Sequence, residues 1–214
     1  YRLFERNIKI SGIFTHYRCA DELSSEYFWQ KSEFKAIKEE VSHICEKLKL
    51  QMPMFHSCNT SALFREENFN EDMCRVGIGA YGYIYNHNPN KKIDLKPVLS
   101  LYANKISTRV LESNLKVGYG GITTLEENTI SSTYDIGYGD GFMRINDYHT
   151  KHKSFSTKDG HNLIGRVSMD YISLDTNKDE VCIFDDVSQL AKIHDTITYE
   201  ILTSLKSYIP KIID

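Results

Sequence analysis

The sequence contains no long apolar run. No stretch approaches the roughly 18 consecutive apolar residues that a membrane-spanning helix requires, and the first residues show no pattern typical of a secretory signal peptide. Apolar residues make up 41% of the 214-residue chain and charged residues 26%, which is ordinary for a soluble globular protein. We therefore expect a cytoplasmic protein of one or two cored domains, without a membrane partner.

The chain also lacks paired cysteines and blocks of basic residues. Its five cysteines are odd in number and form no C-x-x-C pair, which argues against a disulfide framework or a zinc ribbon, so we expect reduced thiols and no metal. The formal net charge of −3, without any basic block, gives no electrostatic footprint for nucleic acid. Neither DNA nor RNA is therefore expected as a partner.

The first 85 residues have the rhythm of alternating strands and helices. A β-rich run at 8–16 precedes a helical pattern of apolar residues, and further apolar runs follow at 52–57 and 73–82. The helical pattern consists of Phe34, Ile37, Val41, Ile44 and Leu48, and the polar residues near the predicted strand ends are His16, His56, Asn59, Thr60 and Arg75. This order predicts parallel strands, whose C-terminal ends bind ligands in α/β barrels. Because three strands cannot close an eight-stranded barrel, residues 1–85 are interpreted as the C-terminal part of a (β/α)8 barrel.

A polar stretch separates this region from a β-rich one. Residues 86–97 are polar, contain Pro89 and end at Pro97, which is typical of a linker. Beyond it, short runs of high β-propensity alternate with turn-forming residues, and a short helical stripe follows near the C-terminus. The β-runs are residues 99–111, 129–136, 162–174 and 180–185, and the stripe is Ile197, Ile201 and Leu205. Residues 98–214 are therefore predicted to form a β-barrel-like or sandwich domain.

The densest functional information lies at residues 117–144. Tyr119 and Tyr138 each stand between glycines, which allow sharp turns and close approach of the backbone to a ligand. A phenol so placed can point into a site. Because the unperturbed pKa of tyrosine is about 10, a catalytic Tyr119 would need cationic neighbours that favour its phenolate.

Seven ordered motifs resemble those of bacterial alanine racemases. V-G-Y-G-G-I-T and D-I-G-Y-G-D-G-F-M-R resemble the family's V-S-Y-G-x-T-Y and P-I-G-Y-A-D-G-x-x-R. The other five are G-I-F-T-H-Y-R-C-A-D-E at 12–22, H-S-C-N-T-S-A at 56–62, C-R-V-G-I-G-A-Y-G at 74–82, G-R-V-S-M-D at 165–170 and T-Y-E-I-L-T at 198–203. The resemblance implies a pyridoxal phosphate enzyme that interconverts L-alanine and D-alanine by a two-base mechanism, and so supplies D-alanine for peptidoglycan. It also implies a homodimer whose sites are shared between subunits.

The resemblance further implies roles for individual residues. In the family, an arginine that matches Arg75 meets the pyridine nitrogen of the cofactor; because a guanidinium keeps its charge, the ring nitrogen would stay unprotonated, which favours racemisation over transamination. Tyr119 would remove and return the α-proton on one face, with His16 beside it and His56 beside Arg75. His16 and Arg75 together would lower the pKa of Tyr119. The implied cofactor-binding residues are His56, Asn59, Thr60, Arg75, Gly77, Ile78 and Tyr199, and the implied substrate-binding residues are Tyr138, Met169 and Asp170.

One family motif has no counterpart in the sequence. Family members carry the cofactor lysine in a segment like V-V-K-A-N-A-Y-G-H-G, and neither Lys9 nor Lys35 lies in such a context; the mid-barrel arginine that helps to bind the substrate carboxylate is also missing. Because the lysine is both the Schiff-base partner and the second base, we expect this chain, which begins with Tyr1, to be a fragment that is inactive alone.

Three alternatives remain open at this point. The chain is either part of an active racemase or a non-catalytic truncated or split-gene product that folds only its β-domain. The substrate is either alanine or another small amino acid such as serine. A generic β-barrel ligand-binding module would not explain His56, Asn59, Thr60 and Arg75 as a set.

Overall fold

The computed structural model describes residues 8–85, 93–145 and 155–213. The chain divides into two compact units, residues 1–96 and 97–214, which we call the N-terminal unit and the C-terminal unit. Of the predicted linker, residues 86–92 lie outside the described residues. Within the described ranges, no helix is both long enough and apolar enough to cross a membrane.

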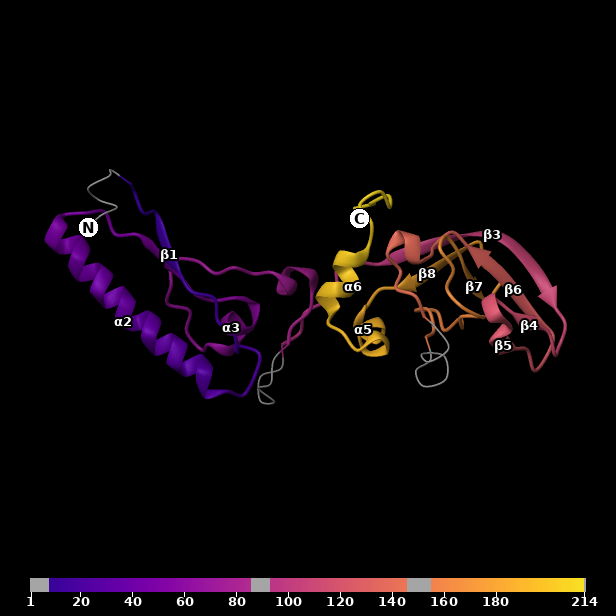
Figure 1. Ribbon diagram of the computed structural model, residues 1–214. Coiled ribbons are helices and arrows are strands. Elements are labelled where there is room, and N and C mark those ends of the chain that lie inside the picture. The colour runs from indigo at the N-terminus through magenta and orange to yellow at the C-terminus, as the bar shows by residue number, and fades with distance from the viewer. Residues whose placement is uncertain (1–7, 86–92, 146–154, 214) are drawn as a thin grey trace. The chain divides into compact units, whose positions relative to one another are not determined.

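The N-terminal unit is built on one strand–helix–strand crossover (Figure 1). Its elements are β1 (Gly12–Phe14), α2 (Ser25–Leu48), β2 (Met54–His56), α3 (Thr60–Arg65) and the 3-10 turn η1 (Ile78–Tyr81). The two strands pair in parallel, with Ile13 opposite Phe55, and the long helix connects them, as the sequence predicts. Helix α2 begins where the Ser24 hydroxyl accepts a hydrogen bond from the N–H of the second helical residue. It ends at Lys49, which adopts the left-handed conformation common at helix C-termini.

The buried face of α2 differs in part from the predicted one. Phe34 is buried and its ring meets that of Phe55 edge-on, with 6.3 Å between centroids. Ile37, which the periodicity places in the core, is 45% exposed, whereas Tyr27 is buried with its ring 4.8 Å from that of Tyr17. Because Tyr27 lies seven residues before Phe34, on the same face, the aromatic pair extends the predicted stripe towards the N-terminus of the helix.

The predicted third strand is wrong. Of residues 73–82, only Arg75 bridges to the neighbouring segment, through an isolated parallel bridge with Asn59, and η1 follows. The reason lies in a side-chain contact: the Gly77 and Gly79 N–H groups donate to the Thr60 hydroxyl at 3.1 and 3.3 Å instead of to a strand. The chain turns there instead of extending the sheet.

The C-terminal unit is mostly antiparallel sheet. Its strands are β3 (Leu101–Leu111), β4 (Lys116–Val117), β5 (Thr123–Thr124), β6 (Thr129–Tyr134), β7 (Ile172–Leu174) and β8 (Glu180–Phe184); its helices are α5 (Ser188–His194) and α6 (Thr198–Ser204), and its 3-10 turns are η2 (Tyr119–Gly121) and η3 (Tyr138–Asp140). Four strands form a sheet in the order β7-β6-β3-β8, and β4 pairs with β5. Strand β3 pairs with β8 at its start and with β6 further along, with register shifts in both ladders, and such irregularities bend a strand.

The core of this unit is formed by side chains of β6, β7, β8 and α5. Its most deeply buried side chains include Tyr134, Ile172, Leu174, Ile183 and Leu190. The predicted strands at β3, β6 and β8 and the helical stripe at α6 are confirmed. The run at 162–174 supplies only β7 and isolated bridges, and α5 was not predicted.

Candidate functional site

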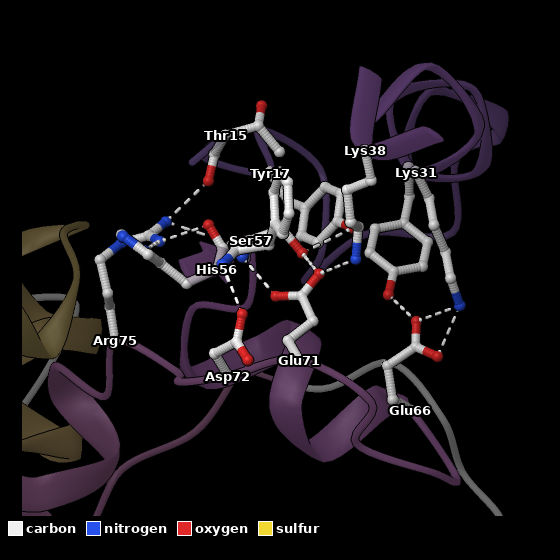
Figure 2. Close-up of polar contacts among 12 residues, drawn as sticks. Thr15, Tyr17, Lys31, Lys38, His56, Ser57, Glu66, Glu71, Asp72 and Arg75 are labelled. Carbon is white, nitrogen blue, oxygen red and sulfur yellow. Dashed lines mark hydrogen bonds and ion pairs between the residues drawn. The ribbon is translucent and has the colours of Figure 1, made fainter. Parts of the chain in front are cut away.

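Arg75 lies at the C-terminal ends of β1 and β2, where its guanidinium is held by backbone carbonyls (Figure 2). Its Nη1 donates to the His56 carbonyl at 3.0 Å, and its Nη2 donates to the carbonyls of Thr15 at 2.8 Å and Ser57 at 3.3 Å. Nη2 also lies 3.5 Å from His16 Nδ1. The structure thus brings His16, His56 and Arg75 together, as the sequence predicts.

The contact between Arg75 and His56 fixes which ring nitrogen accepts. Nη1 lies 2.6 Å from His56 Nδ1, and a guanidinium can only donate. Nδ1 must therefore accept, which leaves Nε2 as the ring nitrogen that carries a proton. The ring of Phe14 stacks on His56 with 5.3 Å between centroids and lies 5.1 Å from the Arg75 guanidinium carbon. Phe14, His56 and the cationic Arg75 therefore form one contiguous cluster of planar side chains.

Thr60 forms a second polar centre in the same unit. Its side chain is buried, and its Oγ1 accepts from the Gly77 and Gly79 N–H groups, which leaves its own proton to donate. The Ile78 N–H opens η1, and the first amides of a helical turn have no partner inside it. A hydroxyl and such amides suit a phosphate. Gly79, which the sequence reasoning missed, must stay small, because a Cβ there would lie 2.8 Å from Thr60 Cγ2.

Asn59, also predicted to bind cofactor, has a local structural use. Its Oδ1 accepts from the Ala62 N–H at 2.9 Å and caps α3, and its Nδ2 donates to the Tyr17 carbonyl at 3.2 Å. The side chain therefore fixes the start of α3, next to Thr60. Its direct contact with a cofactor stays a prediction.

The hydroxyl of Thr60 can be tested by a matched pair of variants. Thr60→Val keeps the side-chain shape but removes the acceptor of two N–H groups, so we expect it to destabilise the N-terminal unit by about 2 kcal/mol. Thr60→Ser keeps the acceptor and loses a methyl group, so a loss of less than about 1 kcal/mol is expected. Amide hydrogen exchange of α2 measures both changes. Equal exchange in Thr60→Val and the unchanged chain would contradict this role.

In the C-terminal unit, the loop 165–170 contacts both glycine-flanked tyrosine turns, those of Tyr119 and Tyr138. The Tyr138 and Gly139 N–H groups donate to the carbonyls of Ser168 and Met169 at 3.0 and 2.7 Å. The turn that carries Tyr119 packs against the start of the same loop: a Cβ on Gly118 would lie 3.2 Å from the Arg166 nitrogen and from Gly165 Cα. The loop 165–170 therefore carries Met169 and Asp170 and contacts the turns of Tyr119 and Tyr138.

These side chains point away from the core of their unit. Tyr119 is 71% exposed, Met169 54% and Tyr138 44%. Exposed aromatic and thioether groups carried on a fixed loop are typical of a surface that meets a ligand or another protein surface. Tyr199, in the first turn of α6, is also exposed.

Two supporting contacts in this unit were missed by the sequence reasoning. Arg166 lies beside the Tyr119 turn, since a Cβ on Gly120 would be 3.0 Å from its Nη1; its place inside the motif G-R-V-S-M-D was the available signal. Tyr208 lies with its Oη 2.9 Å from Asp140 Oδ1, while Asp140 Oδ2 accepts from the Gly137 N–H. The hydrogen bond to the Asp140 carboxylate raises the pKa of Tyr208. The C-terminal segment thus helps to hold the turn of Tyr138.

The chain combines a strand–helix–strand unit with a separate antiparallel β domain, so it is a two-domain protein of the α/β-plus-β class. Arg75 and two histidines at the strand ends form a candidate site for an aromatic ring, and Thr60 a candidate site for an anion. Family models of the alanine racemase N-terminal and C-terminal domains match residues 2–85 and 98–213. The chain belongs to the alanine racemase family.

Individual relatives give the same result. The chain is 40% identical over 99% of its length to an alanine racemase of Nitratiruptor and 39% identical over 97% to one of Campylobacter curvus, and it covers 61% and 59% of those proteins. It therefore spans about three fifths of the length of these curated relatives.

Solved structures share the fold. The chain superposes on Clostridium difficile alanine racemase in complex with cycloserine with a TM-score of 0.79 at 26% identity, covering 95% of this chain and 57% of that one. An alanine racemase from Bartonella henselae with covalently bound pyridoxal phosphate gives 0.73 at 22% identity, covering 96% and 57%.

Proposed function

We propose that this chain is part of a pyridoxal phosphate-dependent enzyme that interconverts L-alanine and D-alanine. The proposal rests on the Arg75 guanidinium. Three backbone carbonyls fix it at the strand ends, its carbon lies over the Phe14 ring, and its Nη1 contacts His56 Nδ1. A donor-only group in that position matches a ring nitrogen that must stay unprotonated. Among relatives, the Bartonella henselae protein holds pyridoxal phosphate.

The residues present fit this cofactor. Thr60 and the Ile78 N–H would hold the phosphate, with Gly77 shaping the turn, and Arg75 would donate to the ring nitrogen; Tyr199 is proposed as a further phosphate contact. When bound, pyridoxal phosphate supplies an electron sink for the charge left at the substrate Cα. By keeping the ring nitrogen unprotonated, Arg75 would limit that sink and so favour return of the proton to Cα.

Other residues would handle the substrate. Tyr119 Oη is proposed to take the Cα proton and return it on the same face, with His16 beside the Arg75 cluster. Tyr138, Met169 and Asp170 are proposed to line the substrate entrance and the carboxylate site. Their attachment to one loop, 165–170, would keep these groups in register with Tyr119.

We also propose that β1 and β2 belong to a larger (β/α)8 barrel. Phe14, Met54 and His56 lie on the same face of this two-stranded sheet by register, opposite the face where Phe55 meets α2. Phe14 is 63% exposed and Met54 46%. Apolar side chains left open on one face favour cover by further strands.

The assembly and setting are proposed on the same basis. The exposure of Tyr119, Tyr138 and Met169 favours a homodimer in which these residues meet the site of a partner subunit. A cytoplasmic enzyme that supplies D-alanine for peptidoglycan is the setting proposed for that activity.

The proposed reaction is tested by isotope exchange. The chain, alone and combined with the N-terminal segment of a full-length relative, is incubated with pyridoxal phosphate and L-alanine in deuterated water, and chirality and α-deuterium are measured. We expect D-alanine with α-deuterium from the combined protein only, and a loss of about 10²–10⁴-fold on Tyr119→Phe. Tyr102→Phe, at an exposed phenol on β3, is the control and should retain activity.

Absence of both exchange and racemisation in the combined protein would refute the proposed function. Faster turnover of L-serine than of L-alanine would change the substrate but keep the reaction. Full activity of Tyr119→Phe would remove that residue from its role.

A further inference from the structure

On the second edge of β2, the segment 71–75 makes only scattered backbone bonds, and its acidic side chains bind the amides of that edge. The Phe55 N–H donates to Asp72 Oδ2 at 2.6 Å, and the Phe55 carbonyl accepts from the Asp72 N–H at 3.1 Å. Two residues further along, the Ser57 N–H donates to Glu71 Oε2. The amides that a third strand would normally bind are thus satisfied by two carboxylates.

Glu71 makes the more extensive contacts of the two (Figure 2). Besides the Ser57 N–H, it accepts from Ser57 Oγ at 2.5 Å and from Lys38 Nζ of α2 at 3.1 Å. Its side chain is only 10% exposed. Although burial opposes ionisation, the bonds from Ser57 and the Lys38 ammonium hold the pKa of Glu71 below its ordinary value. The carboxylate is therefore ionised at neutral pH and joins α2 to the end of β2.

Ser57 connects this carboxylate to the arginine of the candidate site. Ser57 is fully buried, and its N–H and hydroxyl bind Glu71 while its carbonyl accepts from Arg75 Nη2 at 3.3 Å. The preceding carbonyl, of His56, accepts from Nη1, and the following one, of Cys58, accepts from the Arg75 N–H at 2.9 Å. Displacement of Ser57 would move three acceptors of Arg75 at once.

We propose that Glu71 is a positioning residue for Arg75: by clamping Ser57 it sets the carbonyls that aim the guanidinium. That the orientation of the guanidinium matters for contact with the cofactor's pyridine nitrogen rests on the proposed function. The mechanical part of the inference, from Glu71 through Ser57 to the guanidinium, does not depend on it.

The chain offers a matched control in Glu66. This second carboxylate comes from the segment that follows α3, pairs with Lys31 Nζ at 2.6 Å and accepts from the Tyr27 hydroxyl. Like Glu71 it reaches α2, and it does so through these two side chains. Glu66→Gln therefore removes a comparable charge from the surroundings of α2 while both bonds between Ser57 and Glu71 stay in place.

The experiment follows the guanidinium protons of Arg75 by NMR in the full chain with ¹⁵N-labelled arginine, assigned by the loss of signal in Arg75→Lys. We expect Glu71→Gln to speed their exchange with solvent about tenfold, as loss of one charge-assisted hydrogen bond implies, and Glu66→Gln to leave it unchanged. The α2 amides are measured in the same samples. Equal acceleration of α2 and Arg75 in Glu71→Gln would mean general loosening and would overturn the proposal, as would unchanged Arg75 exchange.

A binding readout separates this inference from the proposed function. The probes are 4-deoxypyridoxine 5′-phosphate, which has the ring and phosphate but no aldehyde, and inorganic phosphate. Glu71→Gln should weaken binding of the ring compound about tenfold and leave phosphate binding unchanged. If the unchanged chain binds neither probe, the proposed function fails, while the exchange result still decides the role of Glu71.

A milder variant covers the case in which Glu71→Gln does not fold. Ser57→Ala removes the hydroxyl that bonds both Glu71 and the Tyr17 hydroxyl, and keeps the backbone bond from Ser57 to Glu71. Its Arg75 protons should exchange about threefold faster. Exchange equal to that of the unchanged chain would overturn the proposal.

Discussion

Gly137→Ala is expected to destabilise the C-terminal unit by about 3 kcal/mol or more, the upper range of overpacking costs. The backbone of Gly137 is extended, with φ −152°, a conformation that any residue adopts. The obstacle is space: a Cβ would lie 2.2 Å from the Met169 carbonyl oxygen and 2.6 Å from the Asp170 nitrogen. Those atoms are backbone and are tied to η3 by the bond from the Gly139 N–H. The turn of Tyr138 and the loop of Met169 must therefore separate.

Gly160→Ala supplies the opposite case. Gly160 has φ +83°, and apart from its two chain neighbours no atom of the described residues lies within 4 Å of the position that a Cβ would take there. Alanine at this position therefore costs only backbone strain, about 1 kcal/mol. Hydrogen exchange of β6 and β8 amides compares the two variants. A Gly137→Ala unit as stable as Gly160→Ala would show that the 165–170 loop yields easily and does not hold η3.

Periodicity in the sequence was enough to predict the regular elements. The apolar spacing around Phe34 predicts α2, and alternation predicts β3, β6 and β8. It misplaced Ile37, and it began the stripe at Phe34 although Tyr27, seven residues earlier on the same helical face, is buried against Tyr17. Helix α5 was missed, whereas α6, which has the same length of seven residues, was recognised from the four-residue spacing of Ile197, Ile201 and Leu205.

The residues of the candidate site came from motif resemblance, whereas their geometry did not. The acceptors of Arg75 are backbone carbonyls of residues 15, 56 and 57, and a carbonyl has no signature in a sequence. Glu71 was not singled out for the same reason, since one of its main partners is the Ser57 backbone. The strand expected at 73–82 failed because the Thr60 hydroxyl competes for the amides of Gly77 and Gly79.

Arg75→Lys is expected to be nearly as damaging as Arg75→Met, with each destabilising the N-terminal unit by about 2–4 kcal/mol. The guanidinium reaches the Thr15 carbonyl with one nitrogen and the His56 carbonyl and Nδ1 with the other, and a compact ammonium cannot span both. Lysine keeps the positive charge without the planar fork, whereas methionine has a similar length and no charge. Comparing the two variants therefore separates the effect of the charge from that of the guanidinium geometry. Amide exchange of α2 gives the stability, and 4-deoxypyridoxine 5′-phosphate gives the affinity for the ring. If lysine restored both to the level of the unchanged chain while methionine did not, a point charge at position 75 would suffice, and the fork geometry of Arg75 would have no special part in the site.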